Sequence, residues 1–527
     1  MTSPAAPLLR FESYPGIPRL FLDFVRGRSP YHPDPPTLEA AEARGRQLLG
    51  RKALLPATAF RFRGEEARTL AEDLAAGRAV AVVAGHQVGL FTGPLFTLAK
   101  ALDVIRVARE LTTRGVRAAP VFWALTDDHD LEEVARTARP GPEGPEILVL
   151  EGADRGNRRP VGPLPLPDKV REIVEAFRPD ARDEAGREIL ETFASRYAPD
   201  AAYGEAFLET LLDLVAPDPL LVLDPLREEV RPSAAEFFSR AAAEEARIRE
   251  TLRGVSERLV RERGEAPVPY RPEVFPFFEI REGERRRVAD SRASLPAIAS
   301  GEALASTDVL TRPVLKSFLL PVAASVLGPS EVAYHAQALA LFSILGSPGS
   351  PPPVLLPRSH VILRGPAERR AADALGLSDE DLFSSERERA SEEVPGLAEI
   401  DAIRRTLEEA LSGLAPRLAQ LDATLAGAVE NSRKKIAYQL EQLSERARKA
   451  GQRRDDVAFQ RRRRLETMLL PLGKPAERLY PPLVFLLAHG REALGAIRKG
   501  AQGSLEGAVI VNVGDAKGEE EKKSHVG

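Results

Sequence analysis

The chain has 527 residues, of which 29% are charged, and its formal net charge of −4 at pH 7 provides no overall basic field to attract nucleic acid. It contains no cysteine, which excludes disulfides, thiolate–metal sites and a thioester intermediate on the protein. No apolar run approaches membrane-spanning length and the first residues lack the features of a signal peptide, so we expect a cytoplasmic protein with no membrane partner.

A buried strand followed by a glycine-rich bend is the first strong signal, after two predicted helices at residues 37–49 and 64–76. Residues 79–84 are a continuous run of small and β-branched side chains, which is typical of a strand covered on both faces of a parallel sheet. Glycines follow at 85, 89 and 93, and Pro94 opens a helical pattern. Such a bend lets the backbone approach a ligand closely, and the free amides of the helix favour an anionic group.

The spacing of these glycines is neither the dinucleotide-binding G-x-G-x-x-G pattern nor a P-loop, since Lys100 does not follow in the required position. A tight turn without a ligand is the alternative for the glycines alone. His86 and Gln87 favour a functional site, because both offer hydrogen-bond donors to a developing negative charge. We therefore predict a catalytic role for His86. The predicted substrate-binding residues of this bend are Gly85, Gln87, Gly89, Thr92 and Gly93.

A second apolar run, residues 120–125, ends in an acidic cluster that surrounds His129. Carboxylates and an imidazole at a strand end can act as a general base, as an anchor for an ammonium group or as ligands to a divalent cation. An acidic helix N-terminus is the alternative, but it accounts poorly for the histidine. Because side chains alternate along a strand, we expect either Asp127 with His129, or Asp128 with Asp130, to enter the cleft.

Two strands joined by a helix, each with polar groups at its carboxyl end, form a βαβ unit. Ligands of open α/β sheets bind at that edge, so we predict a Rossmann-like parallel sheet core with the active site where the two segments meet. Asp128, His129 and Asp130 are predicted to be catalytic, and Asp127 to bind substrate. Residues 1–138 then form the N-terminal segment and the first half of the core.

The middle of the chain continues the core with inserted connecting segments. Residues 139–215 alternate helical patterns with breaks, and we predict an insertion there. Residues 216–375 are expected to form the second half of the core, with a second small insertion near 265–300. A turn at residues 328–330 precedes a helix on which Glu331 and Tyr334 lie one turn apart, so we predict that both bind substrate.

The C-terminal third has a different pattern. From about residue 398, leucine and isoleucine recur at intervals of three or four, flanked by charges, which indicates an α-helical coiled coil over residues 390–470. Pro416 should kink or break a helix, so we expect a helical hairpin or a bent coil. Residues 471–512 are predicted to return onto the core and residues 513–527 to form a disordered tail.

These motifs resemble the BshC family, the cysteine-adding enzymes of bacillithiol biosynthesis. The resemblance runs over most of the chain in the family's order, and it rests on residues 83–95, 122–124, 128–130, 328–334, 353–358 and 473–478. The sequence departs from the family at two positions. Family members often have Gln where His86 stands and an aromatic residue where His335 stands.

The resemblance implies a ligase that joins the carboxyl group of L-cysteine to the amine of glucosaminyl-malate, and a homodimer formed through the coiled coil. A free carboxylate is a poor acyl donor, so we expect the carboxyl group to be activated by ATP or another nucleotide, with adenylation preferred. No diagnostic nucleotide motif is present, and no metal is assigned. Two alternatives stay open: a nucleotidyltransferase or ligase acting on another amino acid or sugar, and a non-catalytic coiled-coil scaffold with an anion-binding sheet domain.

Overall fold

The chain divides into two structural units, each described here by itself. The computed structural model describes residues 7–151, 158–347, 351–383, 396–422, 424–451 and 456–514. The larger unit comprises Met1–Pro366 and Thr467–Gly527, and the smaller unit comprises Ala367–Glu466. None of the helices in these described ranges combines the length and the apolar character needed to cross a membrane.

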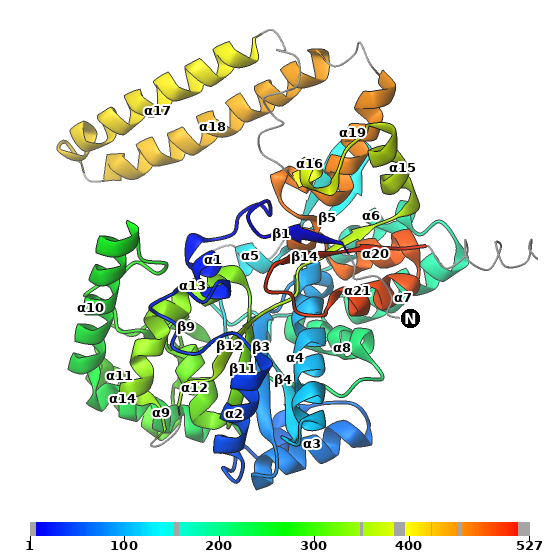
Figure 1. Ribbon diagram of the computed structural model, residues 1–527. Coiled ribbons are helices and arrows are strands. Elements are labelled where there is room, and N and C mark those ends of the chain that lie inside the picture. The colour runs from blue at the N-terminus through cyan, green and yellow to red at the C-terminus, as the bar shows by residue number, and fades with distance from the viewer. Residues whose placement is uncertain are drawn as a thin grey trace, which may run out of the picture. The chain divides into compact units, whose positions relative to one another are not determined.

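A six-stranded sheet with the strand order β12-β11-β3-β4-β7-β2 forms the centre of the larger unit (Figure 1). Its parallel strands are β3 (Val80–Gln87), β4 (Ala118–Leu125), β7 (Leu221–Leu223), β11 (Val322–Leu327) and β12 (Val354–Pro357). The edge strand β2 (Phe60–Arg61) pairs antiparallel with β7. In sequence order, β4 and β7 follow β3 on one side of that strand, and β11 then lies on its other side. This reversal creates a crevice at the carboxyl edge between β3 and β11, which confirms the predicted Rossmann-like core.

Both faces of the sheet are covered by helices, as the unbroken apolar run in β3 predicts. Val80, Val82 and Ala84 belong to a buried cluster with side chains of α2 (Leu38–Leu48), α4 (Leu95–Thr113) and α8 (Tyr203–Val215). The alternate residues Ala81 and Val83 pack in the opposite cluster. The helices of that cluster include α3 (Gly64–Ala76), α9 (Arg231–Ala243), α10 (Glu245–Arg263) and α12 (Arg312–Leu319).

Two groups of elements interrupt the alternation of strands and helices. Between β4 and β7 lie α5 (Leu131–Val134), the hairpin of β5 (Arg136–Gly141) and β6 (Gly144–Val149), and the helices α6 (Val170–Ala176), α7 (Glu184–Arg196) and α8. Between α10 and α12, a three-stranded antiparallel sheet has the order β10-β8-β9. Its elements are β8 (Phe277–Arg281), β9 (Glu284–Arg287), α11 (Ser291–Ser300) and β10 (Leu304–Thr307).

The C-terminal segment of the larger unit returns onto the sheet domain. After β11 come α13 (Pro329–Ala338), α14 (Phe342–Leu345), β12 and β13 (Val361–Arg364); α20 (Pro482–His489), α21 (Glu492–Gly500) and β14 (Gly507–Asn512) follow the smaller unit. Strand β14 lies between β13 and β1 (Leu8–Arg10), and α1 (Arg19–Val25) follows β1. The predicted tail falls mostly on residues 515–527, which lie outside the described residues.

The smaller unit is helical. It contains α16 (Asp379–Phe383), α17 (Leu397–Ala419) and α18 (Thr424–Gly451), while α15 (Pro366–Ala374) and α19 (Asp456–Leu469) run across its two boundaries. Helices α17 and α18 lie side by side as a hairpin (Figure 1), and Arg404 of α17 pairs with Glu441 of α18 at 2.9 Å. The expected helical hairpin is confirmed, but Pro416 does not break the helix, since it lies inside α17, which continues to Ala419.

Candidate active site

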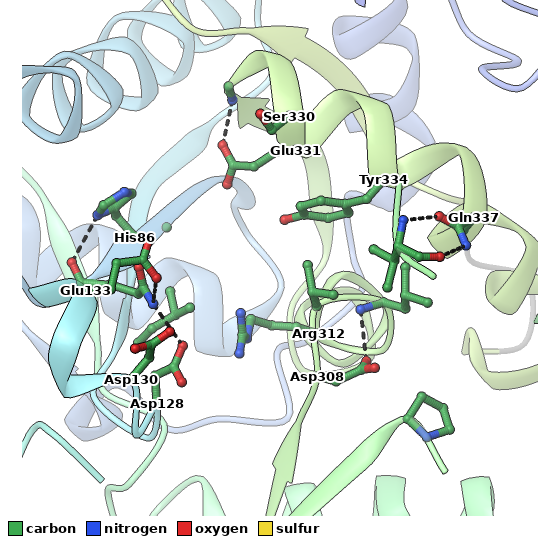
Figure 2. A pocket seen from close by; sticks show the side chains of 18 of the residues that line it. His86, Asp128, Asp130, Glu133, Asp308, Arg312, Ser330, Glu331, Tyr334 and Gln337 are labelled. Atoms are coloured by element: carbon green, nitrogen blue, oxygen red, sulfur yellow. Dashed lines mark hydrogen bonds between the residues drawn. The ribbon is translucent and has the colours of Figure 1, made fainter. Parts of the chain in front are cut away.

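A cavity of about 960 Å³ lies at the carboxyl edge of the central sheet. Its lining residues come from the ends of β3, β4 and β12, from α12 and the start of α13, and from the three-stranded sheet. Figure 2 shows Glu331 and Tyr334 on one side of the cavity and Asp128 and Asp130 on another. Because β3 and β4 pair in register from Val80 to Gln87, the glycine bend and the acidic cluster are neighbours at this edge.

Most of the predicted site residues line this cavity: Gly85, His86, Gln87, Asp128, His129, Asp130, Glu331 and Tyr334. Gly89, Thr92, Gly93 and Asp127 are not among its lining residues. The prediction that only one pair of the acidic cluster enters the cleft is wrong, since Asp128, His129 and Asp130 all line it. Strand β4 ends at Leu125, so the alternation of a strand no longer governs the turn that follows.

The bend before α4 is packed against protein, although Phe96 and Lys100 of the helix line the cavity. The Thr92 N–H donates to the Tyr197 hydroxyl at 2.9 Å, and the Thr92 side chain is fully buried. The Leu95 N–H donates to the Tyr480 carbonyl at 2.8 Å. Pro94 is the residue before the helix and not its first residue. The first amide of the helix is therefore not available for the anion expected after Gly93, because the Tyr480 carbonyl accepts from it, and Tyr197, which follows α7, covers the bend before it.

Asp127 is buried behind the cavity wall. Its Oδ2 accepts a hydrogen bond of 2.5 Å from the Ser306 hydroxyl of β10, whereas Oδ1 has no hydrogen-bond partner among the described residues. The carboxylate also lies close enough to Arg285 and Lys316 to favour their charged forms. Asp127 thus stabilises the charged forms of Arg285 and Lys316 from outside the cavity lining and does not contact a ligand in the cavity.

Asp128 is held as an ionised carboxylate by partners from two distant elements. Its Oδ1 accepts from Arg285 Nη1 of β9 at 3.2 Å, and its Oδ2 accepts from Gln87 Nε2 at 3.3 Å. Burial opposes ionisation, but Arg285, Arg312 and the hydrogen bonds outweigh it and leave the pKa of Asp128 below its usual value. A fixed, ionised carboxylate in a cavity is suited to bind an ammonium group.

Two of the three histidines that line the cavity, His86 and His129, are fixed in opposite tautomers. Arg285 Nη1 lies 2.8 Å from His129 Nδ1, and a guanidinium can only donate, so the proton of neutral His129 is on Nε2. His86 Nδ1 lies 3.0 Å from the Gln87 carbonyl, which can only accept, so His86 carries its proton on Nδ1. The expected donor role of His86 is therefore corrected: its N–H is used by the backbone, and Nε2 is an acceptor.

Both imidazoles are neutral near pH 7. Burial, followed by the charge of Lys100, lowers the pKa of His86 to about 4. Burial, followed by the charge of Arg285, also lowers the pKa of His129. His129 can therefore donate a hydrogen bond from Nε2 to an oxygen that gains negative charge, as a neutral imidazole does in other active sites. It is not available as a proton acceptor at that atom.

A set of cations in the cavity was not predicted from the sequence. Lys100 of α4 pairs with Glu331 at 2.5 Å and donates to the Gly85 carbonyl at 3.0 Å, so it joins the glycine bend to α13. Arg358, after β12, pairs with the buried Glu477 at 2.7 Å. Arg312 and Lys316 of α12 also line the cavity. Their spacing of four residues in an otherwise apolar helix was the only sequence signal for this pair.

Glu477 fixes the cationic side of the cavity from behind. Its carboxylate accepts hydrogen bonds from Tyr14, Arg358, His360 and the Val361 N–H. Burial opposes its charge, but Arg358 and His360 hold the pKa of Glu477 far below its usual value. Among the side chains that the structure describes, no group of three or more His, Asp or Glu converges in a way that could hold a metal ion.

A Rossmann-like sheet with a ligand cavity at its switch point, followed by a helical hairpin, defines an α/β enzyme of small molecules with an added coiled coil. The family model "Bacillithiol biosynthesis BshC, N-terminal Rossmann-like domain" matches residues 37–359. The model "Bacillithiol biosynthesis BshC, C-terminal coiled-coil domain" matches residues 362–505. The chain belongs to the BshC family of bacillithiol biosynthesis.

Relatives named "Putative cysteine ligase BshC" align with most of the chain. The protein of Solibacter usitatus is 29% identical over 523 residues, which cover 92% of this chain and 95% of the relative. The protein of Koribacter versatilis is 29% identical, with 82% and 84% covered, and that of Heliobacterium modesticaldum is 29% identical, with 81% of each chain covered. The predicted family is confirmed, and with it the assignment of the chain to an enzyme family of the ligase class.

Proposed function

We propose that this enzyme joins the carboxyl group of L-cysteine to the amine of glucosaminyl-malate by an amide bond, in the cytoplasm. Family membership and the names of the relatives support this reaction. The main structural support for this reaction is that residues 128–130 and the bend at His86 line one cavity, which several cations also line. Malate carboxylates need cations, and an amino acid's ammonium group needs a carboxylate, so both kinds of partner are required.

The geometry supports distinct roles for the residues of the acidic turn. Asp128, which is ionised and fixed by Arg285, binds the ammonium group of an amino acid. His129 donates from Nε2 to the oxygen of the carboxyl group that gains charge when the amine attacks. Asp130, which is exposed at the cavity, accepts the proton that the attacking amine loses.

Formation of the amide also needs an activated carboxyl group, which a bound ATP or other nucleotide would supply. The residues of the cavity fit a polyphosphate in one respect. Nε of Arg312 is buried without a hydrogen-bond partner in the described part of the chain, and the side chain reaches into the cavity (Figure 2). Arg312 would hold phosphate charge there, while Lys100 and Arg358 are already paired with carboxylates.

The decisive experiment incubates the purified enzyme with ATP, L-cysteine and glucosaminyl-malate and follows the amide by mass spectrometry. Release of AMP or of ADP identifies which phosphate bond is broken. The variant H129A/D130A should lose at least about 100-fold in rate, because a positioned donor and a proton acceptor are both removed. E492Q, an exposed substitution on α21, is the control. A folded enzyme that forms no amide and consumes no ATP would refute the proposal, and a panel of other amino acids and sugars would then test the alternative ligases.

We also propose that the hairpin of α17 and α18 mediates a homodimer. Ile403, Leu414, Tyr438 and Leu443 are large apolar side chains that the hairpin leaves exposed, and a second copy would cover them. Light scattering should give twice the chain mass for the wild type and the single chain mass for I403D/L443D. A wild-type monomer at micromolar concentration would contradict this proposal.

A further inference from the structure

Two cations on one turn of α12 face the cavity and form no direct ion pair with a carboxylate of the described residues. Arg312 and Lys316 are four residues apart, so they lie on the same side of the helix. In Figure 2, Arg312 extends from α12 into the space between Tyr334 and the acidic turn. Arg312 Nη2 donates only to the Thr307 carbonyl, at 3.2 Å, and Nε has no partner among the described residues.

Lys316 lies directly beside the glycine bend. A Cβ placed on Gly85 would be 3.1 Å from Lys316 Nζ, so the absence of a side chain at Gly85 provides the space that the amino group occupies. The amino group also lies 5.6 Å from the centre of the Trp123 ring. Within the described ranges Lys316 forms no ion pair, and a cation–π contact with Trp123 is weaker than an ion pair with a counter-ion.

The other cations around this part of the cavity already have acidic partners. Lys100 is paired with Glu331, Arg285 with Asp128, and Arg358 with Glu477. Asp308 lies four residues before Arg312, but its Oδ1 accepts from the Leu310 and Thr311 N–H groups just before α12. Arg312 and Lys316 feel nearby carboxylates at longer range, but neither forms a direct ion pair with a described residue, so both can contact a ligand.

We propose that Arg312 and Lys316 form an oxyanion subsite that binds a carboxylate or phosphate group of the substrates. This inference deepens the proposed function, on which it rests for the identity of the substrates, by assigning a place to their anionic group. The ligand binds between the guanidinium of Arg312 and the amino group of Lys316, next to the backbone of Gly85. Two charged donors aimed at one point are the usual arrangement for such groups.

Binding at this subsite is coupled to protonation of Lys316. Burial and the charges of Arg312 and Lys100 lower the pKa of Lys316 to about 7, although Glu331 and Asp127 favour the charged form. These groups come from α12, α4, α13 and the turn after β4. His335 of α13 also lies within electrostatic range and is neutral. A bound anion favours the ammonium form, so at pH 8 the empty site holds mostly neutral lysine and takes up close to one proton when the anion binds.

Calorimetry of the full-length enzyme at pH 8 in two buffers of different ionisation enthalpy tests this subsite with L-malate and with inorganic pyrophosphate as probes. The wild type should take up close to one proton per bound anion. K316M should lose the uptake and bind roughly 10- to 100-fold more weakly. K316R should keep the affinity without the uptake, because guanidinium is charged before binding. R312Q should bind roughly 10- to 100-fold more weakly with a smaller uptake, since Lys316 is then more protonated in the empty site.

K499M is the matched control, because it removes one lysine charge from the exposed side of α21. It should match the wild type in affinity and in uptake. Binding of malate alone identifies a carboxylate subsite, binding of pyrophosphate alone a phosphate subsite, and mutual competition a subsite for both. Failure of both probes to bind, or proton uptake that persists in K316M, would overturn the subsite. Because neither measurement needs turnover, this result is independent of the ligase assay.

Discussion

Nη1 of Arg285 lies 2.8 Å from Nδ1 of His129 and 3.2 Å from Oδ1 of Asp128. One guanidinium thus fixes the tautomer of the imidazole and the ionisation of the neighbouring carboxylate. Arg285 is itself oriented by Ser306 at 2.9 Å and by the Thr307 carbonyl at 3.0 Å, and both belong to β10. The small three-stranded sheet is therefore part of the active-site framework, because it supplies the group that gives His129 its donor role.

Replacement of Arg285 by Gln should raise the pKa of His129. The positive charge of Arg285 opposes protonation of the ring, whereas Asp128 and Asp130 favour it, so removal of the arginine takes away the largest opposing charge. NMR titration of the histidine ring measures the shift. The matched control is R286Q, which removes the adjacent exposed charge of β9, paired with Glu284. An unchanged pKa of His129 in R285Q would contradict the assigned hydrogen bond.

Loss of Lys100 should destabilise the larger unit because it leaves Glu331 without its counter-ion. K100M is expected to lower the free energy of unfolding by on the order of 3 kcal/mol. The double variant K100M/E331Q should recover much of this loss. The glutamine side chain carries no charge, and its oxygen can still accept the hydrogen bond of 2.6 Å that the Gly328 N–H donates to Glu331. Urea unfolding of the four proteins in a double-mutant cycle measures the coupling. Additive losses would show that the pair is not coupled.

A side chain at Gly85 should disturb both the sheet and the cavity. The Cβ of G85A would lie 2.7 Å from the Trp123 carbonyl oxygen, so the strands must shift, at a cost of about 1–3 kcal/mol in the free energy of unfolding. The control G254A, in the middle of α10, has no atom within 4 Å of the new Cβ and should stabilise the protein by about 0.5–1 kcal/mol. Thermal or urea unfolding measures both. A G85A protein as stable as the wild type would show that the bend has free space.

Glu477 should make the stability of the enzyme sensitive to acid. Its pKa in the folded state is below that in the unfolded chain, so its contribution is complete above about pH 4.3 and is lost as the pH falls below that value. E477Q should cost roughly 3–5 kcal/mol near neutral pH, because Arg358 is left buried without its partner. Its unfolding free energy should also fall less steeply with acid than that of the wild type. E492Q, on the exposed side of α21, should retain the wild-type pH dependence.

The parts of the fold that the sequence predicts are those set by local pattern. The apolar runs before Gly85 and Thr126 lie in parallel strands β3 and β4, and the predicted helix at residues 64–76 has the same limits as α3. In each case the periodicity and the terminating residues lie within one short segment. Glu331 and Tyr334 were also found, because helical spacing places them on one face.

The parts that could not be predicted depend on contacts between distant segments. Arg285 reaches His129 across 156 residues of sequence, and Glu477 reaches Arg358 across 119. The same limit explains the errors at Thr92 and Gly93. The glycine pattern indicates a bend, but Tyr197 and Tyr480 determine which side of the bend is covered. No local pattern carries that information.

The pairing of β1 with β14 has a consequence for synthesis of the protein on the ribosome. In the described strands, β1 pairs only with β14, and Arg358 receives its carboxylate partner from Glu477. Residues 8–10 can therefore form their strand pair only after residues 507–512 have emerged from the ribosome. A nascent chain that ends before residue 477 has an incomplete cavity wall. The β1–β14 pair and the complete cavity wall therefore form only late in synthesis.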